Sequence, residues 1–197
     1  MNRGFPAKPV PFQQRPLLFL DFDDVLCLNT TYGGYDAMHA LSQVENKKAT
    51  LESFEHLWRD LFTEWSKTHL MALHLEFNPL YVLSTSWTNF MNKAALEAIL
   101  RQTGMAYVAD NLHMDWETVK GTGYPDRVRE IRDWITLHPE HRNHWVVLDD
   151  PYSGAELANW PVKREQRFIV LCTTDVGFLG EHEQLRRALL LRTGGAV

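Results

Sequence analysis

Residues 16–29 read PLLFLDFDDVLCLN, an apolar run that ends abruptly in the carboxylates of Asp21, Asp23 and Asp24. A continuous apolar run of this length, bounded by proline and then by charge, indicates a strand buried on both faces, as in a parallel sheet. Open α/β sheets bind ligands at the carboxyl ends of their strands, so we expect these acids at a crevice. Like charges this close repel one another unless a cation neutralises them. The stretch therefore predicts an α/β fold with a metal site, a reaction, or both, beyond this strand.

The composition of the whole chain is typical of one soluble globular domain. The 197 residues are 45% hydrophobic and 23% charged, and a chain of this length is too short for two full domains. No apolar stretch approaches the ~18 to 20 residues that cross a bilayer. Cys27 and Cys172 lie in apolar runs and no secretory signal is visible, so we expect a cytoplasmic location. The net charge of −5 argues against wholesale coating of nucleic acid but permits a local site.

The first sixteen residues differ in composition from the rest of the chain. They hold Arg3, Lys8 and Arg15, several prolines and no acid, which is typical of a flexible, extended arm. We therefore predict an arm over 1–16 and a single domain over 17–197. A solvated tail is the simplest interpretation, and a basic arm that contacts RNA or a partner is the alternative.

Apolar runs and helical patterns alternate along the rest of the chain. This alternation predicts a mostly parallel, doubly wound, Rossmann-like sheet in three layers, with right-handed crossovers and helices on both faces. Segment 27–50 has no sustained period and predicts a loop or a small flap inserted after the first strand. Further strands are predicted within 80–87, 105–109, 144–150 and 167–175, and helices within 51–78, 88–104, 126–138 and 181–192.

Two groups of side chains receive a structural interpretation. The helical stripe of segment 51–78 predicts core residues, and burial is also predicted for Trp87, although an aromatic ring beside Ser84 could stack a base. His138, His141 and His144 would suit a transition metal, but a solvated loop before a strand is the interpretation that we favour. The stripe consists of Leu51, Phe54, Leu57, Trp58, Leu61, Phe62 and Trp65.

Polar residues end several of the predicted strands. Asp21 and Asp23 end one, Ser84 ends another, and Asp149 with Asp150 ends a third. Any one pair taken alone is more often a turn or a helix cap. Because the carboxyl ends of parallel strands share one edge, the coincidence of two acidic pairs favours a common pocket. Hard oxygen ligands of this kind suit Mg²⁺ with substrate phosphate and water.

Three of these segments resemble, in order, the motifs of the haloacid dehalogenase (HAD) superfamily, whose members are mostly phosphohydrolases. The stretch LLFLDFDDVL is similar to the first motif, an apolar strand followed by Asp, any residue and Asp. The stretch YVLSTSW resembles the second motif, and WVVLDD resembles the fourth. The resemblance covers nearly the whole chain after the arm, and it implies the HAD-like α/β fold.

The resemblance also implies a role for each residue. Asp21 would be the nucleophile that carries a transient aspartyl-phosphate, and Asp23 would protonate the leaving oxygen and then activate water. Ser84 would donate a hydrogen bond to a phosphoryl oxygen. Mg²⁺ would be held by Asp149, Asp150, the Asp21 carboxylate and the main-chain carbonyl of Asp23.

Two positions depart from the family pattern or leave a choice. Asp24 stands where the family often has glycine. The basic residue that steadies the phosphoryl group could be Lys120, which has the usual residue type and a glycine-rich setting, or Arg127, which begins the helix before WVVLDD. The sequence ranks these two equally. The acid at Asp23 favours phosphate chemistry, because dehalogenases of the superfamily usually lack it.

The shortness of the predicted flap indicates the size of the substrate. A nearly capless member of the family implies an open site for a sizeable phosphorylated substrate, such as a nucleotide or a nucleic-acid end. Segment 128–150 and the late segment 170–191 also resemble a branch associated with RNA repair proteins. The expectation is thus a Mg²⁺-dependent phosphomonoester hydrolase. A phosphotransferase with the same site and a non-catalytic phosphate- or nucleic-acid-binding module are the alternatives, and the sequence sets no oligomeric state.

Overall fold

The chain folds around a five-stranded sheet. This computed structural model describes residues 15–120 and 126–194. The strands lie in the order β3-β2-β1-β4-β5, and every neighbouring pair runs parallel. The predicted Rossmann-like α/β fold is confirmed. The strands are β1 (Leu17–Leu20), β2 (Leu80–Leu83), β3 (Leu112–Glu117), β4 (Trp145–Asp149) and β5 (Ile169–Leu171).

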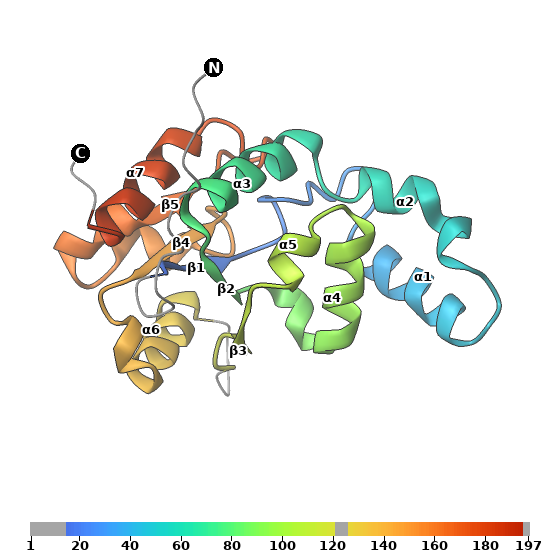
Figure 1. Ribbon diagram of the computed structural model, residues 1–197, viewed down its shortest axis with the longest axis horizontal. Coiled ribbons are helices and arrows are strands. Elements are labelled where there is room, and N and C mark those ends of the chain that lie inside the picture. The colour runs from blue at the N-terminus through green and yellow to red at the C-terminus, as the bar shows by residue number, and fades with distance from the viewer. Residues whose placement is uncertain (1–14, 121–125, 195–197) are drawn as a thin grey trace, which may run out of the picture.

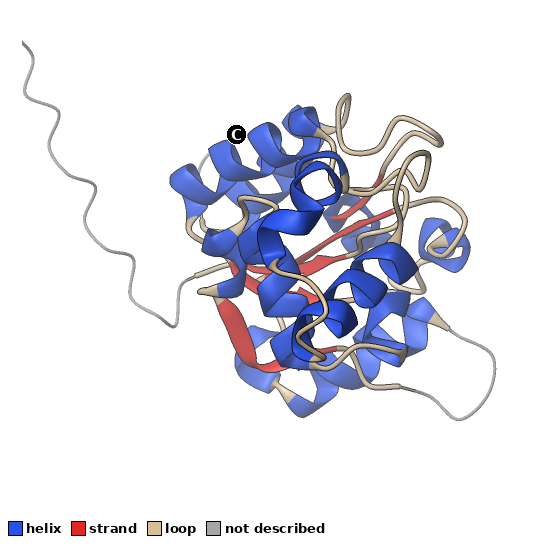
Figure 2. Cartoon of the chain, turned by 90° about the vertical axis from the view of Figure 1, so that its right-hand side faces the viewer, coloured by secondary structure: helices blue, strands red, loops and turns tan. Residues whose placement is uncertain are grey.

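Helices cover both faces of the sheet. Figure 1 shows α3 and α7 along one face and α6 at the opposite face, and Figure 2 shows the strands running between helical layers. Within 15–120 and 126–194, no helix is both long and apolar enough to cross a membrane. The α-helices are α1 (Gly34–Glu45), α2 (Glu55–Asp60), α3 (Glu64–Phe77), α4 (Lys93–Gln102), α5 (Ala106–Ala109), α6 (Arg127–Leu137) and α7 (His182–Arg192), and the 3-10 helices are η2 (Leu51–Phe54), η3 (Ser86–Asn89), η4 (Pro139–His141), η5 (Ala155–Asn159) and η6 (Lys163–Phe168).

Side chains of the sheet pack against both helical layers. Phe19 of β1 meets Trp134 of α6 edge-on, with ring centroids 5.3 Å apart. Tyr81 of β2 contacts the other helical layer: its hydroxyl lies 3.1 Å from Nδ1 of His74 on α3. Every residue of Leu17–Leu20 is fully buried, because β1 has a strand on each side and helices on both faces. This burial explains why β1 is a continuous apolar run.

The strand register decides where the functional site lies. Leu20 pairs with Leu83 of β2 and with Leu148 of β4, so the three strands end at the same level. The backbone N–H of Asp21 continues this pattern by donating to the carbonyl of Leu148 at 3.1 Å, and that of Ser84 donates to Leu20 at 2.9 Å. The polar residues that follow β1, β2 and β4 therefore meet at one edge of the sheet.

The predicted third strand at 105–109 is wrong. That segment forms α5, and the strand β3 lies at Leu112–Glu117. Met105, Val108 and Ala109 are the buried residues of this segment, a spacing of three and four that belongs to a helix. β3 escapes detection because it is an edge strand whose residues are mostly exposed or half-buried, so it lacks a continuous apolar run.

The segment predicted as a loop at 27–50 contains a helix, α1. Gly33 precedes this helix, and its backbone N–H donates to the Asp36 carboxylate at 2.8 Å. The helix buries small residues, Ala37 and Ala40, which are three positions apart. Small side chains give a weak helical period, which is why the pattern of large apolar residues did not reveal α1.

The long helical stripe of 51–78 is divided among η2, α2 and α3. The helical pattern is interrupted at Thr63, because the Thr63 hydroxyl accepts the backbone N–H of Ser66 and caps the start of α3. Leu57, Trp58, Leu61 and Phe62 are buried as predicted, and Leu51 and Phe54 pack against the core as half-buried residues. The prediction that Trp65 is buried is wrong: its side chain is 41% exposed, and its indole N–H donates to the carbonyl of Val176.

Arg15 is tied to the amino edge of the sheet. Its guanidinium donates to the backbone carbonyls of Asn78 and Pro79 and to the side chain of Asn111. These bonds join the segments that lead into β2 and β3. The rest of the predicted basic arm, including Arg3 and Lys8, lies outside the described residues.

Candidate active site

Three of the four predicted metal ligands meet at the carboxyl edge of the sheet. Asp21 follows β1, Asp149 ends β4 and Asp150 follows it, and one oxygen from each lies within 4.8 Å of the others. We call these three residues the acid cluster. Each is at most 1% exposed. Buried carboxylates are rare without a compensating charge, so this cluster requires cations.

Arg127 is the cation that the chain itself supplies. Its guanidinium lies 3.6 Å from Asp21 Oδ1 and 3.3 Å from Asp149 Oδ2, and a third contact reaches Glu130 at 3.6 Å. The residue is buried at the start of α6, where the Asp126 side chain caps the helix by accepting the N–H of Arg129. The cap fixes the first turn of the helix and so places the guanidinium between the two carboxylates.

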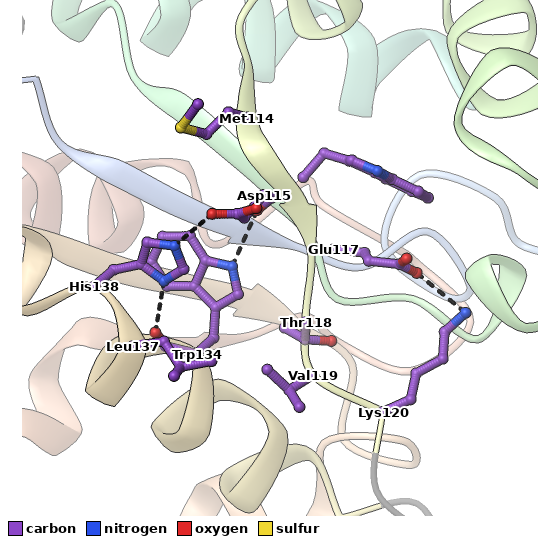
Figure 3. A pocket seen from close by; sticks show the side chains of 10 residues that line it. Met114, Asp115, Glu117, Thr118, Val119, Lys120, Trp134, Leu137 and His138 are labelled. Carbon is purple, nitrogen blue, oxygen red and sulfur yellow. Dashed lines mark hydrogen bonds and ion pairs between the residues drawn. The ribbon is translucent and has the colours of Figure 1, made fainter.

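Lys120, the other candidate for the basic residue, lies elsewhere. Its ammonium pairs with Glu117 Oε2 at 3.1 Å, as Figure 3 shows, and donates to the carbonyl of Thr88. Among the described residues, the ammonium makes its polar contacts with Glu117 and Thr88. The geometry thus separates two residues that the sequence ranked equally, and Arg127 is the one beside the acids.

Burial and mutual repulsion shape the electrostatics of the acid cluster. Burial and the neighbouring Asp149 raise the pKa of Asp21 well above its usual range, against the opposing effect of Arg127. Burial raises the pKa of Asp149 to about 7, also against Arg127. Asp21 Oδ1 and Asp149 Oδ2 are buried and accept no hydrogen bond from the described chain. One arginine does not balance these acids, and the oxygen-only donor set fits a divalent hard cation such as Mg²⁺.

Ser84 reaches the same edge of the sheet from β2. The residue is fully buried, and its hydroxyl has no hydrogen-bond partner within residues 15–120 and 126–194. A buried hydroxyl without a partner is costly unless a ligand satisfies it. This position agrees with the predicted hydrogen bond to a phosphoryl oxygen.

Asp23, whose main-chain carbonyl is the fourth predicted metal ligand, has a side chain that is hydrogen-bonded to residues outside the acid cluster. Its Oδ1 accepts hydrogen bonds of 2.9 Å from the Asn29 amide and from the Trp87 indole. Its Oδ2 accepts the Ser86 hydroxyl at 3.0 Å. Sequence reasoning missed these three donors: the motif stretch YVLSTSW contains Ser86 and Trp87, but it assigned a role only to Ser84, and Asn29 belongs to no motif. Trp87 is 1% exposed, which confirms its predicted burial.

A tight turn begins at Phe22, between the two catalytic candidates Asp21 and Asp23. The backbone N–H groups of Leu26 and Cys27 both donate to the carbonyl of Phe22 at 2.9 Å, and Asp24 adopts φ of 53°. This left-handed conformation favours glycine, and aspartate is among the few other residues that adopt it readily. The turn therefore explains why Asp24 can replace the usual glycine.

Ser153 joins the acid cluster without having been predicted. Its hydroxyl lies 3.1 Å from Asp21 Oδ2 and 3.1 Å from Asp149 Oδ1, and it also donates to Asp150. The turn after β4 brings it there, since Asp150 Oδ1 accepts the backbone N–H of Ser153. Serine after an acidic pair is too common to signal a site, so only the folded turn reveals this contact.

The predicted solvated histidine loop is wrong for two of its three residues. His141 is buried and His138 stacks on Trp134 with ring centroids 3.8 Å apart, while His144 contacts the carbonyl of Arg192. His113 from β3 joins them, with ring centroids 5.1 Å from His138 and 5.2 Å from His141. We call His113, His138 and His141 the histidine cluster.

The hydrogen bonds of the histidine cluster oppose a metal site. Ligand atoms of His113, Asp115 and His138 lie within 4.8 Å of one another, as do those of His113, Glu140 and His141. However, His113 Nδ1 already accepts the backbone N–H of Asp115. His138 donates from Nδ1 to a backbone carbonyl and contacts Asp115 from Nε2, both at 2.8 Å (Figure 3). Two of the three rings are thus engaged in internal hydrogen bonds, which indicates a structural cluster.

Comparison with known proteins agrees with this geometry. A family model described as the HAD domain in Swiss Army Knife RNA repair proteins matches residues 17–182. The chain belongs to this family. No curated protein and no solved structure matches it. The matched region of this HAD domain contains the whole acid cluster, Ser84 and Arg127, and the family suggests phosphohydrolase activity.

Proposed function

We propose that this HAD domain is a Mg²⁺-dependent phosphomonoester hydrolase that works through an aspartyl-phosphate on Asp21. The observation that carries the proposal is the buried acid cluster, paired with Arg127, at the same edge of the sheet as a Ser84 hydroxyl that has no hydrogen-bond partner in residues 15–120 and 126–194. This site offers a nucleophile, a cation and a free donor at one edge of the sheet. Each of these groups has a task in phosphoryl transfer.

Asp21 is the nucleophile of the proposed reaction. Its carboxylate oxygen forms a bond to phosphorus while the bond from phosphorus to the leaving oxygen breaks. Arg127, 3.6 Å from Asp21 Oδ1, favours the ionised form of the carboxylate against the effect of burial, and it attracts the phosphoryl oxygens. The Ser84 hydroxyl, which has no hydrogen-bond partner among the described residues, donates to one of these oxygens.

Asp23 is the general acid and base. Trp87 and Asn29 donate to its Oδ1 through N–H groups that do not accept, so the proton of the acid form resides on Oδ2. That proton passes to the leaving oxygen. Asp23 then takes a proton from the water that attacks phosphorus, which releases phosphate and regenerates Asp21.

The acid cluster would hold the metal ion through Asp21, Asp149 and Asp150. The buried oxygens of Asp21 and Asp149 that accept no hydrogen bond fit this role. Bound Mg²⁺ supplies positive charge that allows an anionic nucleophile to approach an anionic substrate. The Ser153 hydroxyl, which touches all three carboxylates, orients them for this ligation.

The test is release of phosphate from an aryl phosphate, nucleoside monophosphates and oligonucleotides phosphorylated at either end. Wild type and Asp21→Asn are compared with Mg²⁺ and with EDTA. Turnover that requires both Mg²⁺ and Asp21 is the expected result. Turnover that persists in Asp21→Asn would contradict the mechanism, and transfer of phosphate to an added alcohol in preference to water would indicate a phosphotransferase.

A further inference from the structure

A cavity of about 350 Å³ opens beside the proposed general acid. Its lining includes Asp23, Tyr35, Ser86, Asn89 and Phe90, from the turn after β1, the start of α1 and the η3 region. We call it the Tyr35 cavity. It is separate from the pocket of Figure 3, which is lined by β3 and α6. Its volume lies within the usual range for sites of small organic ligands.

The position of Asp23 decides which part of a substrate enters this cavity. A general acid must lie within hydrogen-bond distance of the oxygen that it protonates. In the proposed reaction that oxygen belongs to the leaving group, so the leaving group lies on the side of Asp23. The Tyr35 cavity is the space on that side, and this step rests on the proposed function.

An aromatic pair forms part of the wall of the cavity. Tyr35 and Phe90 stack with ring centroids 4.7 Å apart and an interplanar angle of 14°. Phe90 covers one face of the tyrosine ring, and yet Tyr35 is 70% exposed, so its other face is open. A large aromatic side chain held flat by a neighbour and open to solvent is suited to stack a planar ring.

The aromatic wall is rigidly connected to the catalytic acid. Gly34 lies against the Trp87 ring so closely that an added Cβ would be 2.6 Å from it. Trp87 in turn donates to Asp23. Tyr35, the next residue after Gly34, is therefore held at a fixed place relative to the acid. The Asn89 amide offers both a donor and an acceptor beside the aromatic pair, as the edge of a nucleobase requires.

We propose that the Tyr35 cavity binds the nucleobase of the nucleotide whose phosphate is removed, with the base stacked on the open face of Tyr35. A base carried on a ribose lies one sugar away from the phosphate, which matches an aromatic wall that is beside the acid but outside the acid cluster. The leaving group is then a sugar alkoxide, a strong base that needs a proton from Asp23. Phosphotyrosine is the competing aromatic ligand, but its phenolate leaves with less help because the phenol pKa is about 10.

The experiment measures binding, so that it does not depend on turnover. Affinities for adenosine 5′- and 3′-monophosphate, ribose 5-phosphate and phosphotyrosine are measured by calorimetry in Mg²⁺ on the Asp21→Asn background. Tyr35→Ala is expected to weaken nucleotide binding about tenfold and to leave ribose 5-phosphate unchanged. Tyr35→Phe keeps the stacked ring and is expected to restore the preference. Leu75→Ala, at a 77% exposed position on α3, is the matched control.

Each outcome decides the proposal. Equal affinity for nucleotide and ribose 5-phosphate in the parent protein overturns it, as does equal loss for both ligands in Tyr35→Ala. Tighter binding of phosphotyrosine than of both nucleotides also overturns it. A phosphorylated oligonucleotide and the same oligonucleotide with an abasic terminal residue distinguish an RNA end from a free nucleotide. Failure of the base preference leaves Mg²⁺-dependent hydrolysis of an aryl phosphate intact, so the two proposals fail separately.

Discussion

The acid cluster and the histidine cluster gather titratable side chains in similar ways, but their hydrogen bonding differs. Both bring residues of different elements together at buried or half-buried positions. In the acid cluster, Asp21 Oδ1 and Asp149 Oδ2 accept no hydrogen bond from the described chain, and the pKa of both groups is raised by burial. In the histidine cluster, His113 and His138 use their ring nitrogens for bonds to neighbouring backbone and to Asp115.

This difference teaches how to separate a functional site from a structural one. The density of titratable groups is similar in the two clusters, so density alone does not identify a site. Unsatisfied lone pairs and uncompensated charge do, because folding tolerates them only where a ligand supplies the missing interaction. This distinction can be tested by equivalent substitutions in or beside the two clusters.

Loss of the proposed nucleophile, Asp21, should have the largest effect. Asp21→Asn keeps the shape of the side chain and removes its charge, so kcat/KM for an aryl phosphate is expected to fall by at least about a thousandfold. Asp115→Asn, the equivalent change beside the histidine cluster, is expected to stay within about twofold. Comparable losses in both variants would erase the distinction between the clusters.

Loss of the buried cation should come next. Arg127→Met retains much of the aliphatic volume but removes the charge near Asp21 and Asp149, and kcat/KM is expected to fall about a hundredfold. Lys120→Met serves as the control and is expected to lose less than about threefold, since Lys120 pairs with Glu117. A larger loss in Lys120→Met would reverse the assignment of the basic residue.

Metal addition should stabilise one cluster only. At a Mg²⁺ concentration about a hundred times the Kd, binding contributes about 2.7 kcal/mol, or roughly 5 to 10 °C in Tm for a chain of this size. Asp150→Asn is expected to reduce this shift strongly, and His138→Gln to leave it unchanged. Stabilisation by Zn²⁺ that disappears in His138→Gln would show instead that the histidine cluster binds metal.

The pH dependence of stability should show the smallest effect. Burial lowers the pKa of His113 and of His141 below the ordinary value of 6.5. The unfolded chain then binds more protons than the folded one below pH 6.5, so these residues make the free energy of unfolding decrease as the pH falls below that value. Urea titrations between pH 7.5 and 5 are expected to give a shallower decrease for His141→Gln than for wild type. An identical slope in the two proteins would show that the pKa of His141 is not lowered in the folded state.

The sequence predicts most of the fold and the acids of the site for one physical reason. Central parallel strands are buried on both faces, so β1 and β4 appear as apolar runs that end in acids. The edge strand β3 lacks that pattern, and the small residues of α1 give no strong period. Local signals therefore identify the centre of the sheet better than its periphery.

The sequence alone does not show which side chains meet in the folded protein. Lys120 and Arg127 have the same charge and the sequence ranks them equally, but the capped start of α6 places Arg127 beside the acids. Ser153 and Trp87 reach Asp21 and Asp23 through turns whose geometry depends on tertiary packing. Pairings of this kind appear only once the strand register is known.

The close contact between Gly34 and Trp87 has a consequence for engineering and for divergence within the family. A side chain at position 34 would displace the indole, and the indole orients Asp23. The segment proposed to recognise the leaving group and the residue proposed to protonate it are thus coupled through the Trp87 indole. If segment 27–50 is exchanged between relatives without the partner residues around Trp87, we expect a changed preference for the leaving group and a slower proposed reaction.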